Sequence, residues 1–324
     1  MSTPRGSGTS GHNARRGPAR LAAVAAGAVL AVAAAAGCGS SGGSSSAAGS
    51  GGSAAKKGQG PVDVLYAGSL VNVMEKGVGP GFGSSTGYTF QGFSAGAKAL
   101  ANQIKGEVRP GDVFVSAAPA VNNTLEGSKN GNWVSWYVTF AKAPLVIGYN
   151  PNSKFASALK TKPWYQVLSQ PGIKVGRTDP VTDPKGALTV RALRQAATAD
   201  HQPGLVTAVE KNSTVFPEET LVGRLQSGQL DAGFFYTSEA VPAHIPTVTL
   251  GAVHLAATYT LTVLNKAPHA AGGNAFAQYL LGPSGKSTMT ADGLTLTPFT
   301  VSGDASAVPA QIKSLTSGTA SPGT

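Results

Sequence analysis

The chain has 324 residues, a single cysteine and a formal net charge of +10 at pH 7. Four arginines among the first twenty residues, together with Lys56 and Lys57, carry six of these charges and leave +4 for the rest. This mild surplus, without a basic run interleaved with aromatic residues, argues against a nucleic-acid-binding protein. One cysteine cannot form an internal disulfide bond, so the core has to stabilise the fold.

The first sixty residues differ in kind from the rest. An apolar run over 21–36 follows the arginines and precedes Cys38, and no acidic residue occurs before Asp63. This order is typical of a signal peptide, here 1–37, and Cys38 resembles the lipidated cysteine of exported lipoproteins. We expect a lipid anchor at Cys38 on the extracytoplasmic face of the cell membrane, then a disordered Ser/Gly tether over 38–60. A retained membrane anchor is the alternative, and Sec and twin-arginine export both stay open.

Two strand-turn-helix patterns open the folded part. Residues 62–66 form a strand signal that ends in a turn carrying Ser69, and Ser94 stands between a second strand and a helical apolar stripe. The pattern predicts Ser94 as the N-cap of that helix. A buried strand over 112–116 completes a β-α-β unit. Both serines are therefore expected at the carboxyl edge of a sheet, where open α/β sheets bind ligands.

Strands and helices continue to alternate up to residue 291. Strands are predicted over 133–140, 143–149, 172–177, 232–236 and within 248–264, and helices over 187–199, 218–225, 271–281 and 284–291. Residues 154–168 indicate a helical or loop region, and the composition of 302–324 is that of a low-complexity tail. This order predicts an α/β fold with mainly parallel sheets flanked by helices.

Two strings in the first half carry a family resemblance: YAGSL at 66–70 and FSAGAKALANQIKGEVRPGDVFVSA at 93–117. They resemble the solute-binding proteins of bacterial and archaeal molybdate and tungstate ABC importers, over about residues 62–299. The resemblance implies a two-lobed, type II-like periplasmic-binding-protein fold with crossover hinge strands. The lobes would be 61–143 plus 249–302 and 144–248, followed by the tail 303–324.

The same resemblance implies a function without covalent chemistry. A protein of this kind is a monomer that captures an oxyanion between its lobes and passes it to an ABC permease and its ATPase. Molybdate or tungstate is the expected oxyanion, with sulfate left open. No enzymatic activity and no cofactor are expected.

Four polar residues stand where a strand passes into a loop or helix: Ser69, Ser94, Asp183 and Tyr236. An oxyanion such as molybdate carries no protons near neutral pH, so hydroxyl and main-chain N–H donors suit it without a buried counter-charge. The resemblance matches Ser69 and Ser94 to two serine donors, Tyr236 to a tyrosine donor, and Asp183 to an aspartate that approaches the metal. Taken singly, the same residues could be helix caps, an Asx turn and a core aromatic.

This sequence departs from the tungstate-binding pattern at Phe235, where those proteins carry a glutamate. Either Glu239 substitutes for that glutamate or the anion stays tetrahedral, so the coordination number is left open. Lys185, beside Asp183 in the DPKG loop, completes the predicted ligand set. A backbone N–H near Glu218 is also expected to contribute.

A serine hydrolase is the alternative from another class. Residues 92–96 satisfy G-x-S-x-G between a strand and a helix, with Ser94 as the nucleophile, and acids and histidines follow in hydrolase order. Too few strands precede the motif for a hydrolase core, and no oxyanion loop precedes it. Binding is therefore favoured. The spacing of histidines and acids predicts neither a zinc nor a calcium site.

Overall fold

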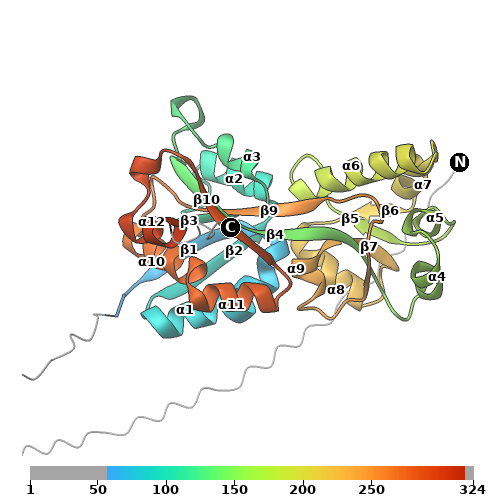
Figure 1. Cartoon of the computed structure of the whole chain (residues 1–324), viewed down its shortest axis with the longest axis horizontal. Helices are drawn as coiled ribbons and strands as arrows, with labels where there is room; N and C mark the ends of the chain where they lie inside the picture. The colour runs from blue at the N-terminus through green and yellow to red at the C-terminus, as the bar shows by residue number, and fades with distance from the viewer. Residues whose placement is uncertain (1–56, 318–324) are drawn as a thin grey trace, which may run out of the picture. The chain divides into compact units, whose positions relative to one another are not determined.

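The computed structural model describes residues 57–317. The expected signal peptide, the lipidation site at Cys38 and most of the tether lie outside the described residues. The described part is built from strands and flanking helices, which confirms the predicted α/β class (Figure 1). Within 57–317, no helix has both the length and the apolarity that crossing a bilayer requires.

One part of the sheet begins with three parallel strands in the order β2-β1-β3. β9 pairs antiparallel with β3, and β4 pairs antiparallel with β9 and β10. The bounds are Pro61–Ala67 (β1), Thr89–Ala95 (β2), Val113–Ser116 (β3), Trp136–Tyr149 (β4), Ala256–Val263 (β9) and Thr295–Gly303 (β10). These strands, with the first part of β4 and their helices, are called the first lobe below.

β4 continues from this part of the sheet into the other. It pairs with β9 as far as Pro144 and with β7 from Leu145 onward, and Figure 1 draws it in green between the two groups of helices. β5 lies parallel to both β7 and β6, and β8 pairs with β4. The bounds are Val175–Arg177 (β5), Ser213–Val215 (β6), Ala232–Tyr236 (β7) and Thr247–Val248 (β8). These strands and their helices are called the second lobe.

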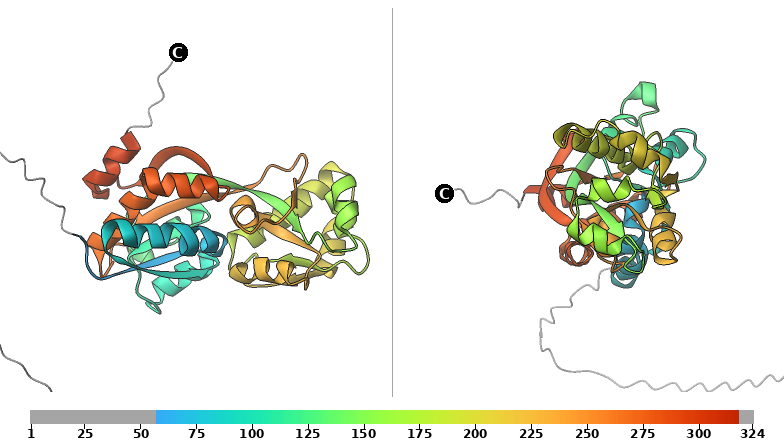
Figure 2. Two further views of the ribbon diagram at one scale, coloured as in Figure 1. Left: turned by 90° about the horizontal axis from the view of Figure 1, so that it is seen from below. Right: turned by 90° about the vertical axis from the view of Figure 1, so that its right-hand side faces the viewer.

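Helices cover both faces of each part of the sheet. In the first lobe, α1, α10 and α11 lie on one side and α2 and α3 on the other (Figure 1), and α12 packs against α10 and β10 (Figure 2). The first-lobe helices are Gly79–Thr86 (α1), Ala97–Lys105 (α2), Pro119–Asn123 (α3), Ala270–Leu281 (α10), Pro283–Ala291 (α11) and Ala310–Ser317 (α12). The second-lobe helices are Ala156–Thr161 (α4), Trp164–Leu168 (α5), Pro184–Ala199 (α6), Leu205–Lys211 (α7), Leu221–Gln226 (α8) and Thr237–Ala240 (α9).

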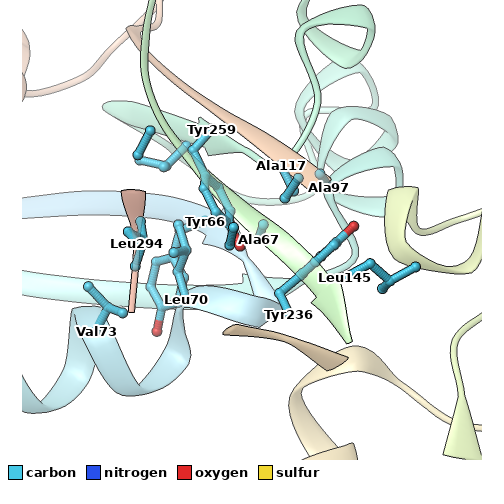
Figure 3. Packing of buried hydrophobic residues seen from close by; sticks show 14 of the residues in the cluster. Tyr66, Ala67, Leu70, Val73, Ala97, Ala117, Leu145, Tyr236, Tyr259 and Leu294 are labelled. Carbon is cyan, nitrogen blue, oxygen red and sulfur yellow. The ribbon is translucent and has the colours of Figure 1, made fainter. Parts of the chain in front are cut away.

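Short 3-10 or π turns fill several connections. They are Gly68–Leu70 (η1), Val73–Val78 (η2), Ser128–Asn130 (η3), Glu218–Thr220 (η4) and Ala305–Ala307 (η5). Buried side chains from both lobes, among them Leu70, Leu145, Tyr236 and Tyr259, pack into one apolar cluster (Figure 3). The turn η1 sits on this cluster through Leu70, whereas η4 is followed by Leu221, which belongs to a second, smaller apolar cluster of the second lobe.

Three sequence expectations differ from the structure. The sheet is mixed instead of mainly parallel, because β4 and β9 pair antiparallel where they connect the lobes. The strands predicted over 133–140 and 143–149 are one strand, since Lys142 is exposed yet still pairs with Thr258 and Thr295. The segment predicted as a low-complexity tail includes α12, whose Ile312 is buried.

The prediction of Ser94 as a helix N-cap is wrong. β2 continues to Ala95 and Gly96 is the N-cap of α2, without a capping side chain. Ser94 pairs in register with Tyr66 of β1. The serine therefore belongs to the sheet, and the first turn of α2 is left with main-chain donors only.

Candidate ligand-binding site between the lobes

A cavity of about 330 Å³ lies between the two lobes. Its first-lobe wall is the end of β2 and the first turn of α2, with Ala95, Gly96 and Ala99. Its second-lobe wall consists of the loop after β5 and the segment from β6 into η4, including Asp183 and Glu218. The cavity thus lies where the sequence predicts strand ends from the two halves of the chain to meet.

The lobes touch directly beside this cavity. The N–H of Ala99 donates to the carbonyl oxygen of Thr182 over 3.1 Å, and the ammonium of Lys98 donates to the carbonyl oxygen of Pro180 over 3.0 Å. Lys98 and Ala99 both belong to the first turn of α2. The Ala99 N–H is one of the main-chain donors of this turn that lack a partner within the helix. The described conformation is therefore closed, with the first turn of α2 held against the loop before α6.

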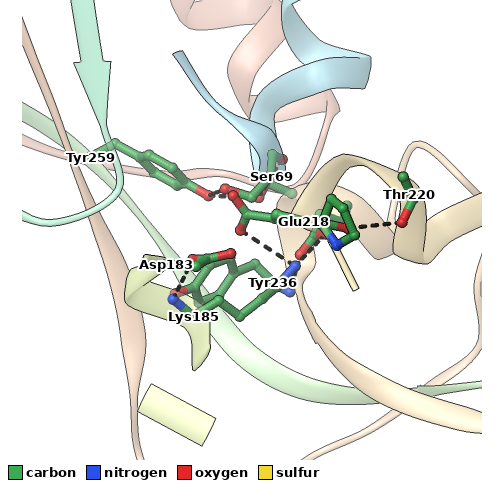
Figure 4. A network of polar contacts seen from close by, with 10 residues as sticks. Ser69, Asp183, Lys185, Glu218, Thr220, Tyr236 and Tyr259 are labelled. Carbon is green, nitrogen blue, oxygen red and sulfur yellow. Dashed lines mark hydrogen bonds and ion pairs between the residues drawn. The ribbon is translucent and has the colours of Figure 1, made fainter. Parts of the chain in front are cut away.

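Four charged residues of the second lobe form a buried cluster, and each exposes 3% or less of its surface (Figure 4). Lys185 Nζ lies 2.6 Å from Glu239 Oε1 and 3.4 Å from Glu218 Oε1. Asp183 is the N-cap of α6, and its Oδ1 accepts a hydrogen bond of 2.7 Å from the Lys185 N–H. The cluster therefore holds three carboxyl groups around one ammonium group.

Burial and mutual repulsion change the protonation of this cluster. Burial raises the pKa of Asp183 to about 6, against the lowering effect of Lys185. Burial, and then the charge of Asp183, raises the pKa of Glu218 well above its usual value. Burial alone would lower the pKa of Lys185, but the carboxylates of Glu239, Glu218 and Asp183 raise it above its usual value. Lys185 stays charged, while the carboxyl groups compete for protons.

Glu239 is the carboxylate that pairs fully with Lys185. Its Oε1 accepts from Lys185 Nζ, and its Oε2 accepts from the N–H of Tyr236 over 2.8 Å. Glu239 is the third residue of α9, and by accepting from the Tyr236 N–H its side chain caps the start of this helix, directly after β7. The glutamate predicted as a substitute ligand thus binds Lys185 and the Tyr236 main chain in the closed protein.

Hydroxyl groups from both lobes adjoin the charged cluster. Tyr259 of β9 donates to Ser69 Oγ over 3.0 Å, and its hydroxyl lies 2.9 Å from Ser238 Oγ. Ser238 also donates to the carbonyl oxygen of Ser69 over 3.3 Å, which joins α9 to η1 across the lobes. The Tyr236 hydroxyl is buried and has no hydrogen-bond partner among residues 57–317. A buried hydroxyl without a partner costs free energy, so it is a group with which a ligand can pair.

Ser94 lies apart from this cluster. Its hydroxyl hydrogen-bonds to the Tyr66 hydroxyl, which in turn donates to Glu75. Ser94 pairs in register with Tyr66 and side chains alternate across a strand, so Ser94 faces the side of the sheet that carries Tyr66. Its neighbours Ala95 and Gly96 line the cavity. Within residues 57–317 the Ser94 hydroxyl thus pairs with a tyrosine hydroxyl, whereas the nucleophile of a hydrolase triad pairs with a histidine.

The structure brings together most of the predicted ligand set and adds to it. Ser69, Asp183, Lys185, Tyr236 and Glu239 meet in one place. The sequence argument expected only a backbone contribution near Glu218 and missed its side chain, which is buried against η1. It also missed Tyr259, which stands at an inward position of the alternating strand ATYTLTV; that alternation was the available signal.

Comparison with known proteins decides the family. The model of the family described as bacterial extracellular solute-binding protein matches residues 62–295. The chain belongs to this family.

This solute-binding protein shares sequence with proteins named for molybdenum and tungsten transport. A Haloferax volcanii protein, named as a molybdenum-binding protein of an ABC transporter, is 30% identical over 192 residues, which cover 59% of this chain and 60% of that protein. The molybdate/tungstate-binding protein WtpA of Thermococcus kodakarensis is 28% identical over 207 residues, which cover 48% of this chain and 58% of WtpA. The chain therefore spans about three fifths of these relatives' length.

The fold of this solute-binding protein matches a solved relative. The periplasmic molybdate-binding protein of Azotobacter vinelandii superposes with a TM-score of 0.57 at 18% identity, covering 73% of this chain and 99% of that protein. This confirms the predicted two-lobed periplasmic-binding-protein fold. Both sequence relatives and this structural neighbour are named as binding proteins.

Proposed function

We propose that this solute-binding protein captures an oxyanion, molybdate or tungstate, between its two lobes and delivers it to an ABC permease driven by its ATPase. The names of the sequence relatives support the choice of ligand. As the sequence predicts, the protein works as a monomer outside the cytoplasm, held to the membrane by a lipid on Cys38 and the tether over 38–60. It binds its ligand and catalyses no reaction.

One observation carries the proposal: hydroxyl donors from opposite lobes converge on one buried site. Ser69 comes from η1 of the first lobe and Tyr236 from the end of β7 in the second, and the Tyr236 hydroxyl has no partner. The first turn of α2, which follows Gly96 at the cavity wall, supplies main-chain N–H groups from the first lobe. A dehydrated anion between the lobes would receive donors from both sides.

The proposed binding mode combines the hydroxyl and main-chain donors with the charged residues that the sequence also predicts as ligands. Lys185 supplies a buried positive charge, and Asp183 Oδ2 is buried with no hydrogen-bond partner in the part of the chain that the structure describes. We propose that the carboxyl group of Asp183 approaches the metal atom of the oxyanion, as the family resemblance implies. The hydroxyl of Ser94 is hydrogen-bonded to Tyr66 and does not take part in the proposed binding. The segment around Ser94 contributes to the site through the main chain of the residues that follow it.

The ligand is tested by calorimetric titration of the purified protein with molybdate, tungstate, sulfate and phosphate. We expect one molybdate or tungstate per chain, with weaker binding of sulfate and phosphate, and a rise in melting temperature with the same two anions. A protein that binds none of these anions would contradict the proposal. Hydrolysis of a model ester that is lost in Ser94→Ala would instead support the alternative hydrolase.

Lobe closure is tested at Gly96. A Cβ atom added there would lie 2.7 Å from the Thr182 carbonyl oxygen and 3.1 Å from Asp183 Cβ, both in the other lobe. Gly96 has φ of −55°, so alanine fits its own backbone. We expect Gly96→Ala to weaken tungstate binding at least tenfold, or about 1.4 kcal/mol, and to enlarge the radius of gyration of the liganded protein in X-ray scattering.

The matched control for closure is Gly223→Ala in α8, where an added Cβ meets nothing within 4 Å. It should leave affinity and radius of gyration unchanged. If Gly96→Ala bound tungstate as tightly as Gly223→Ala, the contact between α2 and the Thr182 loop would not belong to the ligand-bound state.

A further inference from the structure

Glu218 is the one carboxyl group of the buried cluster that reaches across to the other lobe. It lies in η4 of the second lobe, and the main-chain N–H of Ser69 in the first lobe hydrogen-bonds to its carboxyl group. A Cβ atom added at Gly68 would lie 2.9 Å from Glu218 Cβ and 3.0 Å from its Oε2. The Glu218 side chain therefore packs directly against the η1 main chain of the first lobe.

Lys185 neutralises Glu218 only in part, because it is shared with a nearer carboxylate. Lys185 Nζ lies 2.6 Å from Glu239 and 3.4 Å from Glu218 Oε1, and that Glu218 oxygen has no hydrogen-bond partner among residues 57–317. The groups that face Glu218 are Asp183 and Lys185 at the start of α6, Glu239 of α9, the Ser69 amide of η1, and the hydroxyls of Tyr236 and Tyr259. With the three carboxyl groups and Lys185 ionised, the cluster holds three negative charges and one positive charge before any ligand enters.

A doubly charged oxyanion cannot be added to this cluster without compensation. Unit charges a few ångströms apart in a buried site interact strongly, and the anion itself has no proton to give up. The added negative charge can be compensated if one carboxyl group takes up a proton from solvent. We expect this at the carboxyl group that is least fully paired with Lys185. A protonated Glu218 also changes from an acceptor that repels the anion to an O–H donor that can bind it.

We propose that Glu218 makes oxyanion capture proton-coupled: its carboxyl group takes up one proton from solvent when the anion enters the cavity, and so becomes a donor to that anion. This inference rests on the proposed oxyanion function and deepens it. The balance is one oxyanion plus one proton from solvent bound per closed protein, both released on opening. Burial, which raises the pKa of Glu218, favours this protonation.

The direction of the pH dependence follows from this balance. A bound state that holds one more proton than the free state loses affinity as pH rises, up to tenfold per pH unit above the pKa of the free protein. Tungstate and molybdate are the probes. We expect their affinity to fall between pH 7 and pH 9.

The test is calorimetric titration of the full-length protein with tungstate at pH 8 in buffers of different ionisation enthalpy, which counts the protons taken up. We expect roughly one proton per anion for the wild type, from the balance above. Glu218→Gln should take up almost none, and its affinity should vary less than threefold between pH 7 and pH 9. Glu210→Gln, at an exposed residue of α7 outside the cavity lining, is the matched control and should behave as the wild type.

Each outcome decides between the proposals. Wild-type binding without proton uptake overturns the coupling, whether or not Glu218→Gln folds, and leaves the proposed function standing. Proton uptake that persists in Glu218→Gln but disappears in Asp183→Asn overturns the assignment to Glu218. Absence of tungstate and molybdate binding by the wild type overturns the proposed function and the coupling together.

Discussion

Lys185→Met is expected to lower the free energy of unfolding by about 3–5 kcal/mol, the usual cost of removing one partner of a buried ion pair. Lys185 is completely buried and lies 2.6 Å from Glu239. Without its ammonium group, the carboxylates of Glu239 and Glu218 would remain buried without a counter-charge. Urea denaturation at pH 8, where the penalty for uncompensated carboxylates is greatest, measures the loss.

Two controls separate lost charge from lost volume in this experiment. In Lys185→Met/Glu239→Gln the pair is replaced by neutral groups, so we expect most of the stability to return. Lys160→Met, at an exposed lysine of α4, should stay within about 0.5 kcal/mol of the wild type. If Lys185→Met were as stable as Lys160→Met, Lys185 could not be the charge that balances the cluster.

Tyr236→Phe should weaken tungstate or molybdate binding by about 1–3 kcal/mol without lowering the stability of the unliganded protein. The Tyr236 ring is part of the core, but its hydroxyl has no partner within the described residues. Phenylalanine keeps the packing and removes a polar group that the unliganded protein leaves unsatisfied. Calorimetric titration gives the affinity, and thermal melting without ligand gives the stability.

The matched control is Tyr279→Phe, at a half-buried tyrosine of α10 that packs on Phe82 in the first lobe. It should leave the affinity unchanged. A Tyr236→Phe variant that binds both anions as tightly as Tyr279→Phe would remove Tyr236 from the ligand site. A large loss of stability in the unliganded variant would mean that the hydroxyl is structural.

Much of the architecture could be predicted because it depends on local patterns. The strand at 232–236 and the helix before residue 199 are signalled by their own apolar periodicity, and Ser69 and Tyr236 stand at the ends of such strands. Their convergence follows from the general position of ligand sites at the carboxyl ends of strands. These features do not require knowledge of how distant residues pack.

The composition of the site could not be predicted in the same way. Whether Ser94 or its neighbours reach the cavity depends on which face of β2 each residue occupies. A shift of the strand by one residue would exchange the two faces. Whether Glu218 is exposed or buried depends on its packing against Gly68, which is 150 residues away in sequence. The balance of three carboxyl groups and one lysine arises only when α6, η4 and α9 are assembled.

The most direct test of the central claim is anomalous diffraction at a tungsten absorption edge, from crystals of the protein grown with tungstate. We predict one strong tungsten peak per chain, between Ser69 of the first lobe and Tyr236 and Asp183 of the second. A peak at another place on the protein, or no peak in crystals grown with saturating tungstate, would contradict the assignment of this cluster as an oxyanion site.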